Sequence, residues 1–264
     1  METYLRSAKE AAMRAGELLR KHSETPPEVH FKGAVDLVTD LDNRAQNIIY
    51  EVLSSRFPDF DFLAEEDLCE EKGSVFRWII DPLDGTTNYA HNFPVFCVSV
   101  ALEREGEVVL GVIYDPMREE MFCAVKGQGA RLNEKSIRVS SVKELDKSLL
   151  ATGFPYDLRT SRVNNVNHFV HFVTRAQGIR RGGSAALDLC YVACGRFDGF
   201  WELKLQPWDV AAGGLIAKEA GGHVSDFLNG KFDIFGTETL ATNGHIHEQM
   251  VDVLRMEKRG SERN

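Results

Sequence analysis

The hydrophobic pattern at the start of the chain predicts two helices. Apolar residues recur every three or four positions over residues 4–19, the spacing of the buried face of an amphipathic helix. The same spacing returns over residues 45–53, after the acidic residues Asp40 and Asp42. Acidic side chains are favoured at the positive N-terminal end of a helix. We therefore expect a helix pair whose apolar faces cover one layer of the fold.

The region after this pair shows the patterns of β-strands and polar turns. The expected elements are strands at 61–64 and 76–81, a long hairpin at 95–116 that turns at 104–107, and β-rich segments at 119–133 and 136–140. Proline cannot donate a hydrogen bond to a sheet ladder, so Pro82 predicts that the second strand ends near Asp81. The first half of the chain thus combines a helix pair with a mainly antiparallel sheet.

From about residue 148 the pattern alternates between strands and helices. The expected strands are 149–154, 197–203, 223–227 and 239–242, and the expected helices are 166–177, 184–195, 209–222 and a last one through Val251 and Leu254. Such alternation indicates a layered α/β architecture. We divide the chain into an N-terminal subdomain, residues 1–145, and a C-terminal α/β subdomain, residues 146–264. No Pro- or Ser-rich linker separates them, so we expect two subdomains that share an interface and act as one unit.

The charge balance restricts the class of partner. The chain has 31 basic and 40 acidic residues and a net charge of -9, which argues against a protein that grips nucleic acid through its phosphates. An anionic ligand must therefore be met locally, by a metal or by a few placed donors. The first residues are charged throughout, unlike a signal peptide, and no run of about 18 apolar residues occurs. We expect a cytoplasmic protein without a membrane span.

The five cysteines are scattered and form no zinc-binding or redox motif. They are Cys69, Cys97, Cys123, Cys190 and Cys194. We interpret them as reduced and mostly packed thiols, in agreement with a cytoplasmic location.

The segment 78–91, "WIIDPLDGTTNYAH", carries the first candidate chemistry. Two acids follow an apolar run, so their carboxylates project from the end of a buried strand, and Gly85 permits a tight turn that exposes backbone amides. Asp81 and Asp84 can converge on one hard cation but repel each other without it. Alternatively, this is an ordinary acidic turn in which Thr86 caps the following helix.

Acids elsewhere favour the metal site. Glu65 and Glu66 also end an apolar β-like run, and Asp209 lies at the start of the helix in "QPWDVAAGG". Asp209 taken alone is also a good helix N-cap. Acidic clusters at strand ends and helix starts are nevertheless the ligands of Mg²⁺ sites, where a substrate phosphate completes the coordination.

Other catalytic motifs are missing from the sequence. The segment "GGSAA" lacks the second glycine of a nucleophile elbow, so Ser184 is interpreted as a helix cap, and "KGQGARL" lacks the ending of a phosphate-binding loop. Arg180 and Arg181 precede this segment. They are either a solvated surface pair or a place where one guanidinium reaches an anionic group or a sugar hydroxyl.

Two long motifs in this order, "DPLDGTTN" and "WDVAAGGLIAKEAGG", resemble the inositol monophosphatase family of Mg²⁺-dependent, lithium-sensitive phosphatases. The similarity extends to "DLVTDLD", to the glutamate pair and to "GSAALDLCYVACGRFDGFWELKLQPWD". It implies the α/β/α/β/α sandwich of that family and roughly two or three Mg²⁺ ions per site. It also implies a homodimer.

The resemblance assigns roles residue by residue. The implied metal ligands are Glu65, Asp81, the carbonyl of Leu83, Asp84 and Asp209. The implied catalytic residues are Asp42 and Thr86, which orient and activate the attacking water, with Glu65 and Glu66. The implied substrate-binding residues are Asp84, Gly85, Thr86, Gly183, Ser184, Ala185, Glu202 and Asp209. Arg180 is added as a candidate from its place just before "GGSAA", not from the resemblance. One departure is Ala64, where the family usually has glycine before the glutamate pair.

The implied substrate is a phosphorylated polyol or sugar. Inositol 1-phosphate is the first expectation, with fructose 1,6-bisphosphate as a further substrate and a 3'-phosphoadenosine nucleotide as an alternative. A member that only binds a phosphorylated ligand or a protein is the contrasting class. The complete set of acids, together with Asp42 and Thr86, argues against it, because a pure binder does not need a pair of residues that activates water.

Overall fold

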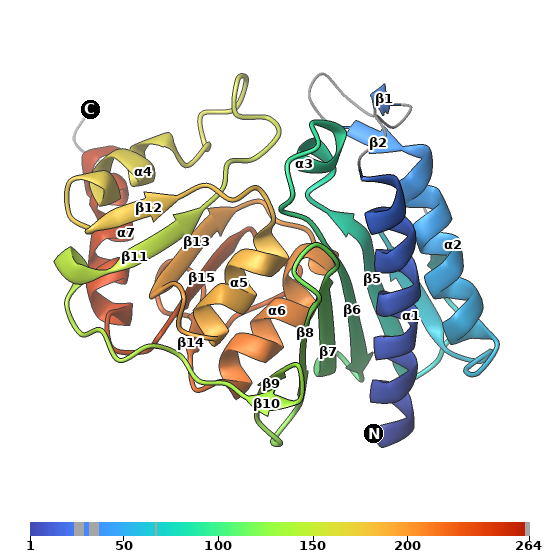
Figure 1. Cartoon of the computed structure of the whole chain (residues 1–264). Helices are drawn as coiled ribbons and strands as arrows, with labels where there is room; N and C mark the ends of the chain where they lie inside the picture. The colour runs from blue at the N-terminus through green and yellow to red at the C-terminus, as the bar shows by residue number, and fades with distance from the viewer. Residues whose placement is uncertain (24–28, 32–36, 67, 262–264) are drawn as a thin grey trace.

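Five layers make up the molecule in a computed structural model that describes residues 1–23, 29–31, 37–66 and 68–261 (Figure 1). Helices α1 (Glu2–His22) and α2 (Asp40–Ser54) cover one face of a large sheet. Helices α5 (Ala185–Ala193) and α6 (Pro207–Glu219) lie between this sheet and a smaller one. Helices α4 (Val166–Val173) and α7 (His247–Ser261) form the outer layer. The predicted α/β/α/β/α sandwich is therefore confirmed.

The large sheet has eight strands in the order β10-β9-β8-β7-β6-β5-β3-β4. Their bounds are β3 (Asp61–Ala64), β4 (Cys69–Glu70), β5 (Phe76–Asp84), β6 (Cys97–Arg104), β7 (Glu107–Asp115), β8 (Glu120–Val125), β9 (Ala130–Leu132) and β10 (Lys135–Ser136). The predicted hairpin is the β6–β7 pair. The strand expected at 136–140 is shorter, because only Lys135 and Ser136 pair with β9.

The smaller sheet has the order β12-β11-β13-β15-β14 and mixes parallel with antiparallel pairs. Its strands are β11 (Leu149–Thr152), β12 (Gly178–Arg180), β13 (Gly199–Leu203), β14 (His223–Ser225) and β15 (Glu238–Thr242). Strand β12 was not predicted from the sequence. A short ladder of β1 (Val29–Phe31) with β2 (Leu37–Thr39) lies outside both sheets, and the first residue of "DLVTDLD" falls outside the described residues.

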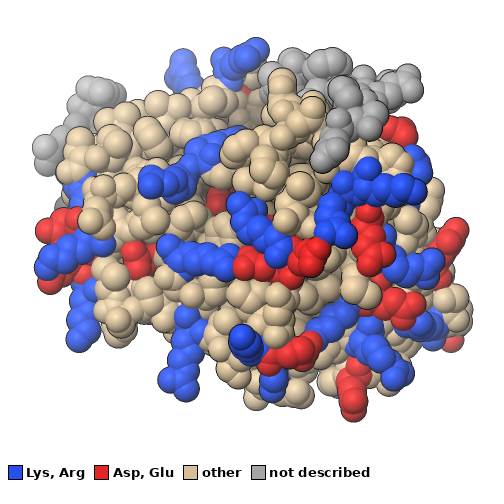
Figure 2. Space-filling view, in the orientation of Figure 1, with Lys and Arg blue, Asp and Glu red and all other residues tan. Residues whose placement is uncertain are grey.

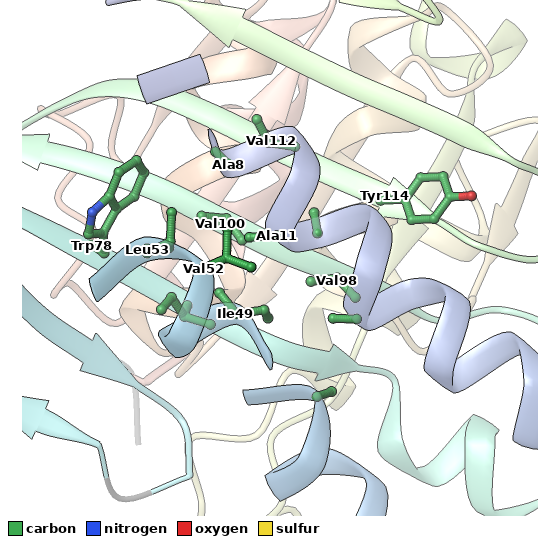
Figure 3. Packing of buried hydrophobic residues seen from close by; sticks show 14 of the residues in the cluster. Ala8, Ala11, Ile49, Val52, Leu53, Trp78, Val98, Val100, Val112 and Tyr114 are labelled. Atoms are coloured by element: carbon green, nitrogen blue, oxygen red, sulfur yellow. The ribbon is translucent and has the colours of Figure 1, made fainter. Parts of the chain in front are cut away.

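The core beneath the helix pair explains the alanine-rich first helix. Ala8 and Ala11 of α1 and Ile49 of α2 point toward Val98 and Val112 in the sheet (Figure 3). Small side chains on α1 allow its backbone to lie close to the strands, where larger side chains from α2 and the sheet fill the space. Apolar burial of this kind is the main source of stability for the layer.

The central helix α6 is apolar on all sides because it packs between two sheets. Its glycines permit close approach. A Cβ on Gly213 would lie 2.8 Å from Leu189 of α5, and a Cβ on Gly111 of β7 would lie 2.8 Å from the carbonyl of Ala212. These close contacts fix the distance of α6 from α5 and from strand β7. They therefore also fix the position of its N-terminus relative to both sheets.

Strand β5 corrects the expected end point at Asp81. It continues to Asp84, with Asp81 opposite Ser99 and Asp84 opposite Cys97 on strand β6. The register shifts between these two pairs, and the shift accommodates Pro82, which lacks the N–H that a regular ladder needs. Both carboxylates consequently emerge from an irregular strand end.

Charged side chains on the face seen in Figure 2 are interspersed by sign. Ion pairs on the protein include Lys126 with Glu107 and Arg196 with Glu120. None of the described helices combines the length and the apolar character that a membrane crossing requires.

Candidate active site

A cavity of 360 Å³ opens where the two sheets and the central helices meet. Its walls come from the end of β5, from α3 (Thr86–Ala90), from the N-termini of α5 and α6, and from strands β11 and β13 with the segments that follow them. These elements come from both halves of the chain, so neither half forms the cavity alone.

Three carboxylates form an acidic cluster at one end of this cavity, named here the metal end. One oxygen from each of Asp81, Asp84 and Asp209 lies within 4.8 Å of the others. The backbone N–H of Leu83 donates to Asp81 Oδ1 (2.9 Å), and the backbone N–H of Gln206 donates to Asp209 Oδ2 (2.7 Å). Each hydrogen bond fixes one oxygen and leaves the other available to a cation.

Asp84 is anchored across the two halves of the chain. Its Oδ2 accepts hydrogen bonds from the Ser184 hydroxyl (2.6 Å) and from the backbone N–H of Ala186 (2.8 Å). Ser184 is the N-cap of α5, so the free N–H groups of a helix start stabilise this carboxylate. The cap predicted for Ser184 is confirmed.

The electrostatics of the metal end fit a bound cation. Burial raises the pKa of Asp81 well above its usual value, and the charges of Glu65, Asp84 and Asp209 raise it further. Burial likewise raises the pKa of Asp209, with a further contribution from Asp84. Carboxylates packed this closely repel each other unless a cation neutralises them, and oxygen ligands alone suit a hard divalent ion.

Thr86 connects this cluster to helix α2. Its Oγ1 lies 3.2 Å from Asp42 Oδ1 and 3.1 Å from the carbonyl oxygen of Leu83. One hydroxyl proton can serve only one of the two acceptors at a time. Asp42 is fully buried, so the structure brings together the pair that the family resemblance predicts.

The turn before Thr86 requires glycine. Gly85 has φ 102°, and a Cβ there would lie 2.9 Å from the carbonyl oxygen of Val95. Any larger residue would strain this turn and move the strand end.

The glutamate pair divides between two places. Glu65 lines the cavity, whereas Glu66 is not among the described residues that line it. The backbone N–H of Glu66 donates to Gln46 Oε1 (3.1 Å), and Gln46 Nε2 donates to the Glu66 carbonyl (2.8 Å). Through these bonds, Glu66 holds the strand end against helix α2, while Glu65 faces the acids.

A second group of lining residues, named here the distal end, consists of Glu202 of β13 with Gly183 and Ala185. Burial raises the pKa of Glu202 to about 8, although the nearby Arg181 charge opposes this shift. The distal end is close enough to the metal end for the charge of Asp84 to raise the pKa of Glu202 as well. The structure places Arg181, rather than Arg180, at the cavity. Arg180 is exposed at the end of β12 and donates to the carbonyl of Ile179 (3.0 Å). Successive side chains of an extended segment point to opposite sides, which accounts for the difference.

Sequence reasoning missed Asp188 and Gly153, which also line the distal end. Asp188 follows Ser184 by four residues, so both lie on one face of α5. A lone acid in an otherwise apolar helix was a usable signal. Gly153 had none, because its role depends on Glu202, which is distant in the sequence.

Solved structures define the class of fold. The chain superimposes with a TM-score of 0.89 on an inositol monophosphatase from Anabaena, at 43% identity and covering 97% of this chain and 96% of that one. It superimposes with a TM-score of 0.91 on the extragenic suppressor protein SuhB from Bartonella henselae, at 41% identity and covering 96% and 98%.

The chain belongs to the inositol monophosphatase family, whose model matches residues 1–259. An inositol-1-monophosphatase from Synechocystis is 45% identical over 96% of this chain and 89% of its own length. The Nus factor SuhB from Escherichia coli is 41% identical over 97% of both chains.

Proposed function

We propose that this protein hydrolyses the phosphate monoester of a polyol or sugar, with inositol 1-phosphate as its main substrate and with Mg²⁺ as its cofactor. The observation that carries the proposal is the metal end of the cavity. Three carboxylates there have one oxygen fixed by a hydrogen bond, and the Thr86–Asp42 pair lies beside them. Family membership and the similarity to named inositol monophosphatases support the same activity.

Glu65, Asp81, Asp84, Asp209 and the Leu83 carbonyl would hold the Mg²⁺ ions. Bound Mg²⁺ supplies positive charge that offsets the phosphate dianion and lowers the pKa of water. The carboxylates keep this charge in place because their own positions are fixed by backbone donors.

The chain's own residues would position the reactants. Thr86 Oγ1 would take a proton from the attacking water as its own hydroxyl proton passes to Asp42 Oδ1, a carboxylate already in hydrogen-bond range, so that the threonine stays neutral. The backbone N–H groups of Gly85 and Thr86, at the start of α3, face the phosphate oxygens. Ala185, Gly183 and Glu202 bind the hydroxyl groups of the polyol.

The test is a side-by-side assay of phosphate release from inositol 1-phosphate, fructose 1,6-bisphosphate and 3'-phosphoadenosine phosphate at the same millimolar Mg²⁺. We expect the highest kcat/KM for inositol 1-phosphate, loss of activity with EDTA and inhibition by Li⁺. No release from any of the three would contradict the proposed function. A higher kcat/KM for 3'-phosphoadenosine phosphate would support phosphatase activity but contradict inositol 1-phosphate as the main substrate.

A second role in binding has one observation in its favour. The relative from Escherichia coli carries the name Nus factor, although it is similar to this chain over nearly its whole length. We also propose a cytoplasmic homodimer, as the family resemblance implies. Light scattering after gel filtration tests the dimer, and an inactive Asp84→Asn variant that retained a cellular function would separate binding from hydrolysis.

A further inference from the structure

The distal end of the cavity contains an acid to which no role has yet been given. Asp188 is the one charged residue of helix α5, and its side chain lines the cavity although the residue is only 3% exposed. Within the described part of the chain, no group donates a hydrogen bond to its carboxylate. A buried acceptor without a donor is unfavourable, so a ligand that donates a hydrogen bond to it would stabilise this arrangement.

Glu202 is also a buried acid that accepts no hydrogen bond from the described residues. It is 8% exposed and lines the same end of the cavity. The charge of Glu202 acts on Asp188 and raises its pKa, so the two acids face the same space. Two neighbouring acceptors without donors form a surface that suits hydroxyl groups, because each hydroxyl can donate one proton.

The backbone around these acids leaves room for them. A Cβ on Gly153 would lie 2.1 Å from Glu202 Oε1, and a Cβ on Gly182 would lie 3.0 Å from Asp188 Oδ1. A side chain at Gly153 would therefore displace the Glu202 carboxylate from its present position, and one at Gly182 would make a tight contact with the Asp188 carboxylate. This agreement between backbone and side chains indicates a formed subsite rather than two acids left by chance.

The positive charges nearby do not balance the two acids. Arg181 lowers the pKa of both Asp188 and Glu202 but forms no direct ion pair with either in the described structure. Lys204 also lines the cavity, but its Nζ lies 2.6 Å from Asp157 Oδ2 and is thereby occupied. The distal end consequently offers two carboxylates against one available cationic side chain.

We propose that Asp188 is a specificity-determining residue that acts together with Glu202 to select a polyol with one phosphate and free hydroxyl groups over a substrate with a second phosphate. The inference rests on the proposed function, since it assumes that the reacting phosphate lies at the metal end. Free hydroxyls donate to both carboxylates. A second phosphate brings negative charge and oxygen acceptors. In addition to burial, the charge of Asp84 raises the pKa of both acids, so a cation that neutralises Asp84 favours their ionised form, and in that form they repel the second phosphate.

Position along α5 supports this assignment. Ser184 at the start of the helix donates to Asp84 at the metal end, and Asp188 lies one turn later on the same face. One helix thus holds a carboxylate of the metal end and presents the distal acid about 5–6 Å further along its axis. That separation is comparable to the width of a six-membered ring with its hydroxyls.

The experiment compares wild type with Asp188→Asn on inositol 1-phosphate and fructose 1,6-bisphosphate. Asparagine keeps the shape of the side chain and removes its charge. It also adds an N–H group that can donate a hydrogen bond to a second phosphate. For inositol 1-phosphate we expect kcat/KM to fall about tenfold, mainly through KM, because a hydroxyl donates a weaker hydrogen bond to a neutral amide oxygen than to a carboxylate. The kcat/KM for inositol 1-phosphate divided by the kcat/KM for fructose 1,6-bisphosphate should fall by at least about tenfold.

Asp146→Asn is the matched control, because it makes the same change at an exposed residue that is not among those lining the cavity. It should leave both kcat/KM values unchanged. An equal fall for both substrates in Asp188→Asn, or an unchanged ratio, would show a structural role and overturn the inference. Thermal unfolding of the variant separates a loss of folding from a change of preference.

A second measurement keeps the two proposals apart. If wild type releases no phosphate from any substrate, the proposed function fails, and calorimetric binding of myo-inositol to both proteins then decides the inference. Weaker binding of myo-inositol to Asp188→Asn would support the distal subsite. Equal affinities, or no binding to either protein, would overturn it.

Discussion

The two ends of the cavity differ in whether the protein donates hydrogen bonds to their carboxylates. At the metal end, Asp81, Asp84 and Asp209 each have one oxygen held by a backbone N–H. At the distal end, Glu202 and Asp188 accept no hydrogen bond from the described residues. Burial raises the pKa of all five acids, so the difference lies in their donors rather than in their depth.

This difference separates a part of the site that is organised in advance from a part that waits for the substrate. Fixed carboxylates suit a small cation, whose ligand positions are demanding. Carboxylates without donors suit hydroxyl groups, which bring their own protons and differ between substrates. The metal end would therefore determine whether phosphate is hydrolysed, and the distal end would determine which phosphate ester is chosen.

The largest expected effect is at the metal end. Asp84→Asn should lower phosphate release by on the order of 10³-fold, because it removes a charge that the cation shares with Asp81 and Asp209. The amide oxygen can still accept from Ser184 and Ala186, so the fold should persist. Phosphate release and circular dichroism check both parts.

Cation binding by this variant sharpens the comparison. In wild type, Mg²⁺ should raise the midpoint temperature of thermal unfolding. At a Mg²⁺ concentration one hundred times its dissociation constant, the unfolding free energy should increase by about 2.7 kcal/mol. In Asp84→Asn the increase should be much smaller. Near wild-type turnover in Asp84→Asn would show that the acidic cluster is not the metal site.

The next effect concerns the Thr86 hydroxyl. Thr86→Ala should lower kcat by about 10²-fold, because it removes the group that links the water to Asp42. Thr86→Ser is the matched variant, since it keeps the hydroxyl and loses only a methyl group. The expectation fails if alanine and serine lower kcat to the same extent, because that result would assign the effect to packing.

A smaller effect is expected at the anchor of Asp84. Ser184→Ala removes one of its donors and the N-cap of α5, while the backbone N–H of Ala186 remains. We expect roughly tenfold weaker Mg²⁺ binding and a loss of about 1 kcal/mol in unfolding free energy. Mg²⁺ titration followed by calorimetry measures the first, and chemical denaturation measures the second. Unchanged Mg²⁺ affinity would show that the serine acts on the helix alone.

Local pattern was sufficient for much of the fold. The three- and four-residue spacing of α1 and α2 and the polar turn of the β6–β7 hairpin depend on nearby residues, so the sequence predicts them directly. Strand β5 past Pro82 depends on its pairing with β6, a long-range contact that the proline signal could not include. Strand β12 has three residues, too few for a recognisable pattern.

The site divides in the same way. Asp81 and Asp84 are close in the sequence and part of a motif, so their convergence was predictable. Asp209 was a candidate from its place at a helix start, and the family resemblance favoured it as a ligand over a simple helix cap. The choice between Arg180 and Arg181 depends on strand β12, which the pattern does not reveal. Asp188 becomes meaningful only beside Glu202 and the glycine that makes room for it, and the fold alone brings these residues together.

A gradual effect, spread over several pH units, tests the distal end. The Glu202 pKa rises from 4.5 in the unfolded chain to about 8 in the folded one. A raised carboxyl pKa means that the folded state holds the proton more tightly, so the stabilisation is complete below pH 4.5 and disappears as the pH rises toward about 8. The unfolding free energy of metal-free wild type should therefore fall across this window. Glu202→Gln cannot titrate, so its slope should be shallower by at most about 1.4 kcal/mol per pH unit. Urea denaturation of both proteins, with the exposed Glu51→Gln as control, measures the slopes, and parallel slopes for wild type and Glu202→Gln would refute the effect of burial.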